Sequence, residues 1–227
     1  MRIEHIGDAT LYLGDCMDIM REMLDKAYSL AIVDPPYGIG VDKMTLGNGA
    51  VKIYRGTENW DILPPSKEYF FELFRVSKNQ IIWGANNFSL PPMSSWIFWD
   101  KLTGANDFSD GELAWSSFGG ALRKYTKLWL GANAKDEDGR IHPTQKPVAL
   151  YKWLLSRYAK PGDTILDTHG GSGSSVVACM DMGYSITWIE KDEDYFNAAL
   201  KRIEIAYQQP RLFDEPRVKT VPQELGL

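Results

Sequence analysis

Short apolar runs that alternate with helical stretches constrain the fold of this chain most strongly. The apolar runs occupy residues 9–13, 29–33, 80–83, 95–101, 163–167 and 184–190. The helical stretches occupy residues 17–24, 66–76, 147–159, 174–182 and 192–207. Strands that alternate with helices join into a parallel sheet whose two faces are covered by those helices. The sequence therefore predicts an α/β fold with a doubly wound, mostly parallel sheet.

The interval 102–140 breaks this alternation. Gly, Asn, Ser and Asp residues punctuate short aromatic runs there, so we expect a small irregular insertion with one or two hairpins. The insertion belongs to a single domain over residues 1–207, and the polar tail 208–227 is expected to be loosely ordered. Four tryptophans are interpreted as core of this region rather than as a surface that stacks on bases: Trp96, Trp99, Trp115 and Trp129.

The composition is that of an ordinary soluble protein, with 44% hydrophobic and 24% charged residues among 227. No run approaches the roughly 18 consecutive apolar residues of a membrane span, so no membrane partner is expected. Two cysteines and three histidines are scattered, which argues against a disulfide framework or a metal site and favours the cytoplasm. The net charge of −5 disfavours an all-basic nucleic-acid surface but permits a local basic patch.

A glycine-rich loop over residues 167–174 joins an expected strand to an expected helix. Glycines allow the backbone to approach a ligand closely, and the helix start offers free N–H groups. Glu190 ends the next strand, where a carboxylate can bind ribose hydroxyls. Together they predict an adenosine-containing cofactor. The loop is neither a P-loop nor a G-x-G-x-x-G motif, so S-adenosylmethionine is favoured over a nicotinamide; the alternative is a tight strand–helix turn without a ligand.

The tetrapeptide Asp34-Pro35-Pro36-Tyr37 directly follows the second apolar run. The exocyclic amine of a nucleobase is a poor nucleophile because its lone pair is delocalised into the ring. A carboxylate that accepts one N–H and a proline carbonyl that accepts the other can redirect that lone pair, and an aromatic ring can stack on the base. We therefore expect these four residues to be catalytic; the alternative is a strand that ends in a proline-rich turn.

At this point the chain resembles the amino-methylating DNA methyltransferases that act on adenine N6 or cytosine N4. The motif order resembles their beta group, with the Asp-Pro-Pro-Tyr motif before a target-recognition region and the cofactor loop last. Four further segments carry the resemblance: Gly14-Asp15, Trp83-Gly84-Ala85-Asn86, His142-Pro143-Thr144-Gln145-Lys146-Pro147, and Ile189-Glu190 followed by Tyr195. The resemblance covers most of residues 9–207 and implies the circularly permuted methyltransferase sheet, with recognition of the target assigned to the insertion 102–140.

The resemblance also implies a set of residues that bind S-adenosylmethionine. These are Asp15, Asp34, His142, Thr144, Lys146, Asp167, His169, Gly170, Gly171, Ser172, Gly173 and Glu190. For His142 a loop histidine, and for Lys146 a solvated lysine at a helix start, stay open as alternatives. One departure stands out: relatives usually have Asp-Pro-Phe before the glycines, where this chain has Asp167-Thr168-His169.

The implied reaction is transfer of a methyl group to the N6 amine of an adenine flipped out of duplex DNA. Asp34 and the Pro35 carbonyl would hold the amine and Tyr37 would stack on the base, with no metal and no covalent enzyme intermediate. Alternatives are cytosine N4 methylation, methylation of RNA or a protein amide, and a DNA-binding relative that has lost the cofactor. Cytosine C5 chemistry is excluded because neither Cys16 nor Cys179 follows a proline, and both are expected to be buried.

The implied partner is double-stranded DNA, in the cytosol of a bacterium, an archaeon or a phage-infected host. Two groups of basic residues are candidates for phosphate contacts. One lies in the insertion and one in the loop after Tyr37: Arg123, Lys124 and Lys127, and Lys43, Lys52 and Arg55. A solvated face is the alternative for the first group. A homodimer and a paired restriction endonuclease are further partners that such a family admits.

Overall fold

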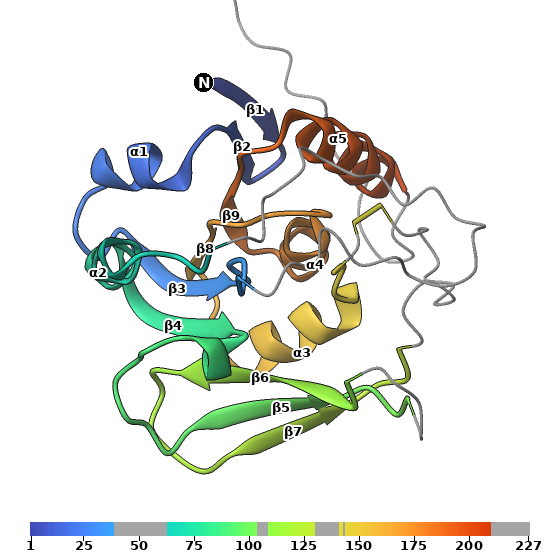
Figure 1. Ribbon diagram of the computed structural model, residues 1–227. Coiled ribbons are helices and arrows are strands. Elements are labelled where there is room, and N and C mark those ends of the chain that lie inside the picture. The colour runs from blue at the N-terminus through green and yellow to red at the C-terminus, as the bar shows by residue number, and fades with distance from the viewer. Residues whose placement is uncertain (39–62, 104–108, 130–140, 143, 210–227) are drawn as a thin grey trace, which may run out of the picture.

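The computed structural model describes residues 1–38, 63–103, 109–129, 141–142 and 144–209. Its centre is a nine-stranded sheet in the order β1-β2-β9-β8-β3-β4-β6-β5-β7 (Figure 1). The strands in that order are Arg2–Ile6, Ala9–Leu13, Ser185–Glu190, Thr164–Asp167, Tyr28–Val33, Ser77–Trp83, Gly111–Ser116, Trp96–Asp100 and Arg123–Thr126. The five strands β2, β9, β8, β3 and β4 are mutually parallel, which confirms the mostly parallel sheet.

Helices cover both faces of this sheet (Figure 1). Helices α1 (Cys16–Arg21) and α2 (Lys67–Val76) lie on one face, and α3 (Val148–Tyr158), α4 (Ser174–Met182) and α5 (Glu193–Gln208) lie on the other. A short 3₁₀ helix, Ala85–Asn87, follows β4. Strand β3 shows why both faces are covered. Leu30 and Ile32 pack with the α3–α5 layer, whereas Ala31 and Val33 pack with the α1–α2 layer. The doubly wound arrangement is therefore confirmed.

The N-terminal strand β1 and the short helix α1 differ from the sequence-based expectation. Strand β1 pairs antiparallel with β2 and was not expected, because its side chains are mostly exposed and show no buried face. The helix expected over 17–24 ends at Arg21. After it, the backbone N–H groups of Glu22 and Met23 donate hydrogen bonds to carbonyls three residues earlier, which ends the α-helical pattern. Leu24 fits the helical spacing but is 79% exposed, so its apolar character was misleading.

The segment expected to be irregular, 102–140, contributes two strands to the sheet among its described residues, β6 and β7. Strand β6 lies within the sheet, antiparallel to both β4 and β5, and β7 forms the edge. Trp99, Trp115 and Trp129 are buried, as expected for core residues, and Trp96 is half-buried. Because two antiparallel pairings separate β4 from β5, strands β5 and β7 run in the same direction as β4.

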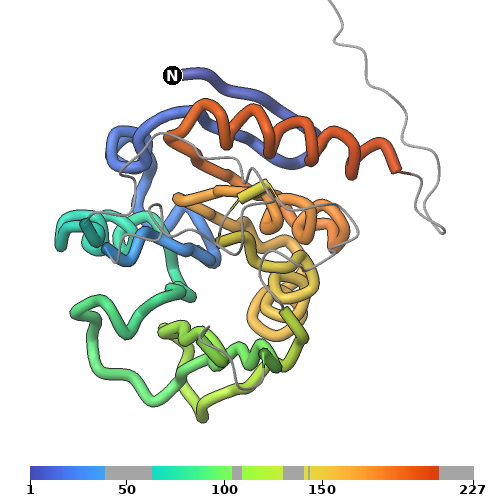
Figure 2. Tube along the Cα trace, turned by 45° about the vertical axis from the view of Figure 1, so that its right-hand side comes forward, coloured from blue at the N-terminus to red at the C-terminus, as the bar shows by residue number. Residues whose placement is uncertain are grey.

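The beginning of the chain contacts its last described helix. Figure 2 shows β1 next to α5, and an Arg2 Nη1 atom donates to Asn197 Oδ1 at 2.9 Å. The Arg2 guanidinium also lies 5.3 Å from the centre of the Phe196 ring. These contacts fix the hairpin of β1 and β2 against α5. None of the helices described is long and apolar enough to cross a membrane.

A core substitution tests the contact between α3 and the sheet. Leu154 is fully buried in that layer, so Leu154→Ala should lower the free energy of unfolding by about 2–5 kcal/mol. Urea denaturation followed by circular dichroism measures the change. Leu24→Ala, at a 79% exposed site, is the control and should change the free energy by less than about 0.5 kcal/mol. Equal effects of the two substitutions would contradict the packing described.

Candidate active site

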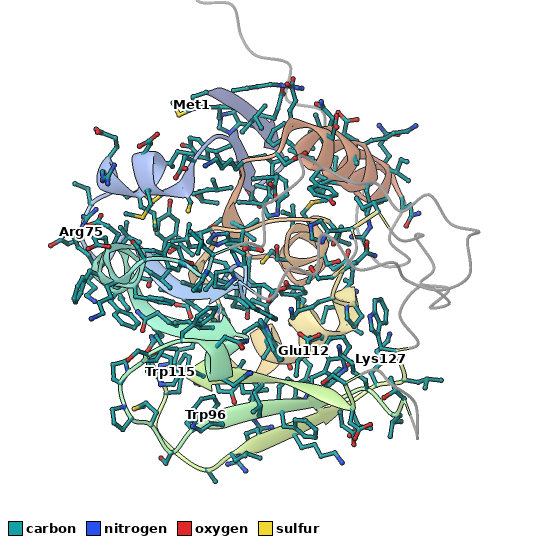
Figure 3. The ribbon with its side chains drawn as sticks, in the orientation of Figure 1. Met1, Arg75, Trp96, Glu112, Trp115 and Lys127 are labelled. Atoms are coloured by element: carbon teal, nitrogen blue, oxygen red, sulfur yellow. The ribbon has the colours of Figure 1, made fainter. Side chains whose placement is uncertain are left out.

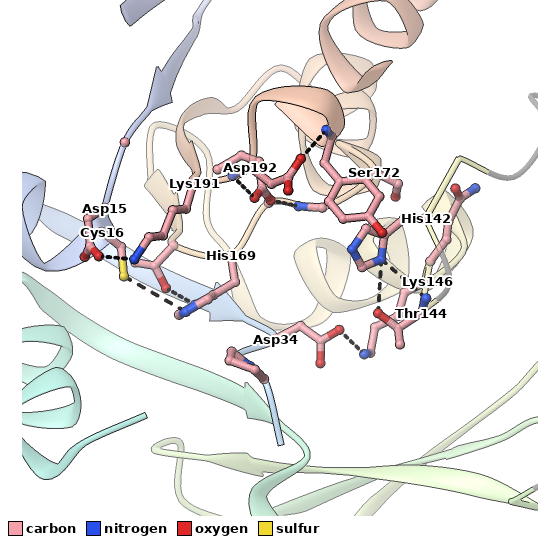
Figure 4. A pocket seen from close by; sticks show the side chains of 18 of the residues that line it. Asp15, Cys16, Asp34, His142, Thr144, Lys146, His169, Ser172, Lys191 and Asp192 are labelled. Carbon is pink, nitrogen blue, oxygen red and sulfur yellow. Dashed lines mark hydrogen bonds and ion pairs between the residues drawn. The ribbon is translucent and has the colours of Figure 1, made fainter. Parts of the chain in front are cut away.

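The carboxyl ends of β3, β8 and β9 meet at one edge of the sheet because these strands are parallel and adjacent. Asp34 follows β3, Asp167 ends β8 and Glu190 ends β9. A cavity of about 480 Å³ opens at this edge (Figure 4). Eleven of the expected site residues line the cavity: Asp15, Asp34, Pro36, His142, Thr144, Lys146, His169, Gly170, Gly171, Ser172 and Glu190. Four others do not: Pro35, Tyr37, Asp167 and Gly173.

The glycine loop passes close to neighbouring side chains. A Cβ atom at Gly170 would overlap the Trp188 ring, so only glycine fits between β8 and β9 here. The Gly171 backbone, at φ +52°, donates its N–H to Glu190 Oε2 at 2.8 Å. The other carboxylate oxygen, Oε1, accepts from Asp192 N at 2.8 Å. These two bonds fix the Glu190 carboxylate at the cavity wall.

Asp167 lies behind the wall rather than in it. Its carboxylate accepts from Ser175 Oγ at 2.6 Å and from His169 N at 3.2 Å, which ties the loop to the start of α4. Burial raises the pKa of Asp167 to about 7, against the opposing effect of those hydrogen bonds, and the Asp34 and Glu190 carboxylates raise it further. In this structure Asp167 supports the loop, and the expected contact with a cofactor stays a prediction.

His169, which departs from the family pattern, belongs to a small polar network. Its Nδ1 atom lies 3.0 Å from Thr168 Oγ1, which in turn lies 2.7 Å from Tyr69 Oη. Its Nε2 atom lies 4.0 Å from Cys16 Sγ, and its ring meets Tyr69 edge-on. Burial lowers the pKa of His169 to about 4, so the imidazole is neutral at neutral pH. The histidine therefore fills the wall as an uncharged ring.

Asp15 and His142 line opposite sides of the cavity in Figure 4. Asp15 caps α1 by accepting from Met17 N at 2.9 Å and pairs with Lys191 at 2.8 Å. Burial acts to raise the pKa of Asp15, but Lys191 outweighs it and the pKa is lowered. The His142 ring lies 4.3 Å from the Tyr195 ring, and its Nδ1 atom is 3.1 Å from Thr144 Oγ1. His142 therefore faces the cavity with its ring held from two sides.

Both oxygens of the Asp34 carboxylate have partners. Tyr37 Oη donates to Oδ1 at 2.5 Å, and Lys146 Nζ pairs with Oδ2 (Figure 4). Burial raises the pKa of Asp34, and the Lys146 ammonium opposes that rise. Tyr37 does not project into the cavity, because its ring packs against Gly84, where a Cβ atom would overlap it. The structure therefore places Tyr37 beside the cavity, with its hydroxyl on the Asp34 carboxylate.

Lys146 is buried, which excludes a solvated lysine at a helix start. Its ammonium lies between Asp34 and Glu112, with 2.9 Å between Nζ and Glu112 Oε2. Lys146 therefore lies beside Asp34 as well as in the cavity wall. Glu112 was not among the expected site residues.

Several other cavity residues were not assigned to the site by the sequence reasoning, although some lie within its motifs. They are Cys16, Gln145, Tyr151, Thr168, Lys191 and Asp192. Most adjoin a residue that was expected, so extending each motif by one or two positions could have found them. Cys16 is only half-buried, unlike the buried Cys179, and burial raises its pKa to about 12, which keeps it a thiol.

The basic residues of β7 do not form one cluster at the cavity. Arg123 begins the strand, whereas Lys127 follows its end, on the edge of the sheet that carries the cavity. Lys124 is exposed and pairs with Asp100 at 2.6 Å. None of the three lines the cavity. The second group, Lys43, Lys52 and Arg55, lies outside the described residues.

Comparisons with known proteins agree with this geometry. Residues 106–201 match a family described as DNA methylase. The chain is 25% identical over 255 residues to the Type II methyltransferase M.HinfI of Haemophilus influenzae, covering 89% of this chain and 71% of the relative. It is 27% identical over 168 residues to the Type II methyltransferase M2.DpnII of Streptococcus pneumoniae, covering 74% of this chain but only 56% of that relative.

Solved structures show the same fold. The complex of M1.HpyAVI with SAM superposes with a TM-score of 0.57 at 20% identity, covering 86% of this chain and 98% of that one. The cytosine-N4-specific PvuII DNA methyltransferase superposes with a TM-score of 0.54 at 13% identity, covering 88% and 91%. The matches confirm the resemblance to amino-methylating DNA methyltransferases and the methyltransferase type of α/β sheet.

The raised pKa of Asp167 predicts a pH-dependent stability. The folded state keeps the proton up to about pH 7 whereas the unfolded state releases it near pH 4, so stability falls as the pH rises between these values. Asp167→Asn should therefore stabilise the protein more at pH 8 than at pH 5, as measured by urea denaturation at both values. Asp18→Asn, on exposed α1, is the control and should show no such difference. If Asp167→Asn changed the free energy of unfolding equally at pH 5 and pH 8, the raised pKa of Asp167 would be contradicted.

Proposed function

We propose that this relative of the amino-methylating DNA methyltransferases transfers a methyl group from S-adenosylmethionine to the N6 amine of an adenine in double-stranded DNA. One observation carries the proposal: the Asp34 carboxylate and the Glu190 carboxylate open into the same cavity, which is walled by the glycine loop. The first suits a nucleobase amine and the second suits the hydroxyls of a ribose. A methyl donor and its acceptor would meet in that cavity.

The cavity fits S-adenosylmethionine in size and in chemistry. Its volume of about 480 Å³ lies within the range of roughly 300–1,000 Å³ that is typical of small-molecule sites. Glu190 would hold the ribose hydroxyls, and the segment 170–172 would lie along the cofactor. Asp15 and His142 would bind at the two ends of the cavity. When bound, the cofactor supplies an electrophilic methyl group on a sulfonium sulfur.

The residues around Asp34 would orient the substrate amine. Asp34 Oδ1 accepts a hydrogen bond from Tyr37 Oη in this structure and would accept one from the amine N–H when a base is present. The Pro35 carbonyl would accept the second N–H. With both protons held, the nitrogen lone pair points out of the base plane toward the methyl group. Positioning of this kind can supply up to about 7–11 kcal/mol of the barrier reduction.

Tyr37 would move to stack on the base. Its ring now packs on Gly84 and lies edge-on to Phe88, with a centroid distance of 6.1 Å. Release of its hydroxyl from Asp34 would free both the ring for stacking and Oδ1 for the amine. Stacking of this kind is worth about 1–3 kcal/mol for each base.

DNA would approach the edge of the sheet that carries the cavity. Lys127 lies at this edge and is the member of its group best placed for a phosphate contact. Arg123 would contact DNA further from the cavity, and Lys124 would first have to leave Asp100. The expected homodimer and paired endonuclease stay predictions.

Transfer of labelled methyl groups tests the proposal. The protein is incubated with methyl-labelled S-adenosylmethionine and unmethylated genomic DNA, and the nucleosides are separated after digestion. We expect label in N6-methyladenosine, and at least about 100-fold less with Asp34→Asn because the amine loses its carboxylate acceptor. Glu72→Gln, in an ion pair on α2, is the control and should retain the wild-type rate.

Other outcomes of this assay would contradict the target base, the substrate class or the role of Asp34. Label in N4-methylcytosine would preserve the mechanism and change the target base. Label in RNA or protein, with none in DNA, would change the substrate class. Near-normal transfer by Asp34→Asn would remove Asp34 from its catalytic role.

Binding of the cofactor gives a second test. Glu190→Gln removes a charged acceptor, so the dissociation constant for S-adenosylmethionine should rise about 10-fold to 100-fold in isothermal titration calorimetry. The amide oxygen can still accept from Gly171 or Asp192, which limits damage to the loop. Glu193→Gln, at the exposed start of α5, should bind as the wild type does. Unchanged affinity in Glu190→Gln would place the ribose elsewhere.

A further inference from the structure

Four charged residues form an alternating chain that ends at Asp34. Lys101 Nζ lies 2.5 Å from Glu112 Oε1, and Lys146 Nζ lies 2.9 Å from Glu112 Oε2. Lys146 Nζ also pairs with Asp34 Oδ2. Lys101 follows β5, and Glu112 is the second residue of β6, which runs the opposite way. Both residues therefore lie at the edge of the sheet that carries the cavity. Figure 3 shows Glu112 between β6 and α3.

The chain is shielded from solvent. The Lys146 side chain is 2% exposed, and those of Asp34, Lys101 and Glu112 are between 15% and 22% exposed. The Lys146 ammonium lies 5.4 Å from the centre of the Trp83 ring, which closes one side of it. Charges in such surroundings are screened weakly by water and salt. Each member of the chain therefore acts on the next more strongly than it would at an exposed site.

We propose that Glu112 is a positioning residue for Asp34, because it shares the Lys146 ammonium and so keeps the Asp34 carboxylate a strong hydrogen-bond acceptor for the substrate amine. In a simple pair of Lys146 and Asp34, the ammonium would draw negative charge toward Oδ2 and weaken Oδ1. Sharing with Glu112 holds Lys146 in place without this loss. The inference rests on the proposed function, in which Oδ1 receives the amine N–H.

Lys101 is the second basic partner of Glu112. Burial acts to raise the pKa of Glu112, but Lys146 and Lys101 outweigh burial and lower that pKa to about 2, so Glu112 stays charged. Lys146 stays charged as well, because its two carboxylate partners raise its pKa despite burial. Without Lys101, Glu112 would pull harder on Lys146 and loosen its hold on Asp34.

The charged and titratable groups around Asp34 predict the sign of each change. Lys146 lowers the pKa of Asp34 and Glu112 raises it, with Tyr37 donating to Oδ1; Asp167, Tyr69 and Tyr151 lie further off. Removing the charge of Glu112 should lower the pKa of Asp34. Removing the charge of Lys101 should raise it. A purely structural role would not produce opposite signs.

Two variants and two measurements test the inference. Glu112→Gln and Lys101→Met are compared with wild type in the pH dependence of kcat for methyl transfer. The pKa of Asp34 is also measured directly, without cofactor or DNA, by NMR titration of the protein labelled with ¹³C-carboxyl aspartate. Asp34→Asn assigns the signal, and Glu72→Gln is the control for loss of a distant ion pair.

We expect the acid limb of kcat and the Asp34 titration to move down by about half a unit to one unit in Glu112→Gln and up by a similar amount in Lys101→Met. Above the acid limb, kcat should fall about 3-fold to 10-fold in Glu112→Gln, with the KM for the cofactor unchanged. Shifts of the same sign, or no shift in either variant, would overturn the inference.

Two further outcomes are also decisive. Circular dichroism shows whether Glu112→Gln folds. If it does not fold, the direction in which the pKa of Asp34 shifts in Lys101→Met alone supports or overturns the inference. If the wild type transfers no methyl group, the proposed function fails. The NMR titration then still decides whether Glu112 and Lys101 set the charge of Asp34 in opposite directions.

Discussion

The pairing of β8 with β3 on one side and β9 on the other is the constraint on which the site depends. Hydrogen bonding in this register brings the carboxyl ends of three parallel strands to one edge. Asp34, the glycine loop and Glu190 are far apart in the chain, yet each directly follows or ends one of these strands. Without β8 between them, the carboxylates of Asp34 and Glu190 would have no common cavity.

The burial of charged side chains is the second constraint. The protein satisfies it by placing basic and acidic side chains in alternation next to Asp34. An isolated buried carboxylate is unfavourable, and a buried ion pair is stable only when its geometry and its remaining bonds are satisfied. Asp34 is satisfied by Lys146 and Tyr37, and Lys146 is satisfied in turn by Glu112. The Tyr37 hydroxyl donates to the remaining Asp34 oxygen. Both oxygens of the Asp34 carboxylate are therefore covered by neighbouring side chains.

The strands and helices that depend on the local pattern of apolar residues were predicted well from the sequence. Strands β3 and β8 and helix α4 were expected at or near their observed bounds, because their apolar residues follow one another without interruption. The motif at 34–37 and the loop at 167–174 could be placed at a common edge by the rule for parallel strands. Strand β6 was missed as part of the sheet because glycine and serine around it suggested a loop.

Contacts between distant segments could not be read from the sequence. Glu112 reaches Lys146 only because β6 runs antiparallel to β4, a pairing that no local pattern in 102–140 indicates. The position of Tyr37 likewise depends on the missing Cβ atom of Gly84 at the end of another strand. Asp167 has the spacing of a cofactor residue, but its bond to Ser175 turns it toward α4.

The order of strands in the sheet also has a consequence for synthesis of the chain. Strands β9 and β8 separate β2 from β3, yet they are translated last among the strands. A ribosome-bound chain that ends before residue 164 therefore carries β2 and β3 with unpaired edges, which are sites for misfolding and aggregation. The contact of Arg2 with Asn197 forms only when α5 has emerged. Folding of the sheet centre must wait until β9 has been synthesised, and pairing of strands that are far apart in sequence is intrinsically slow.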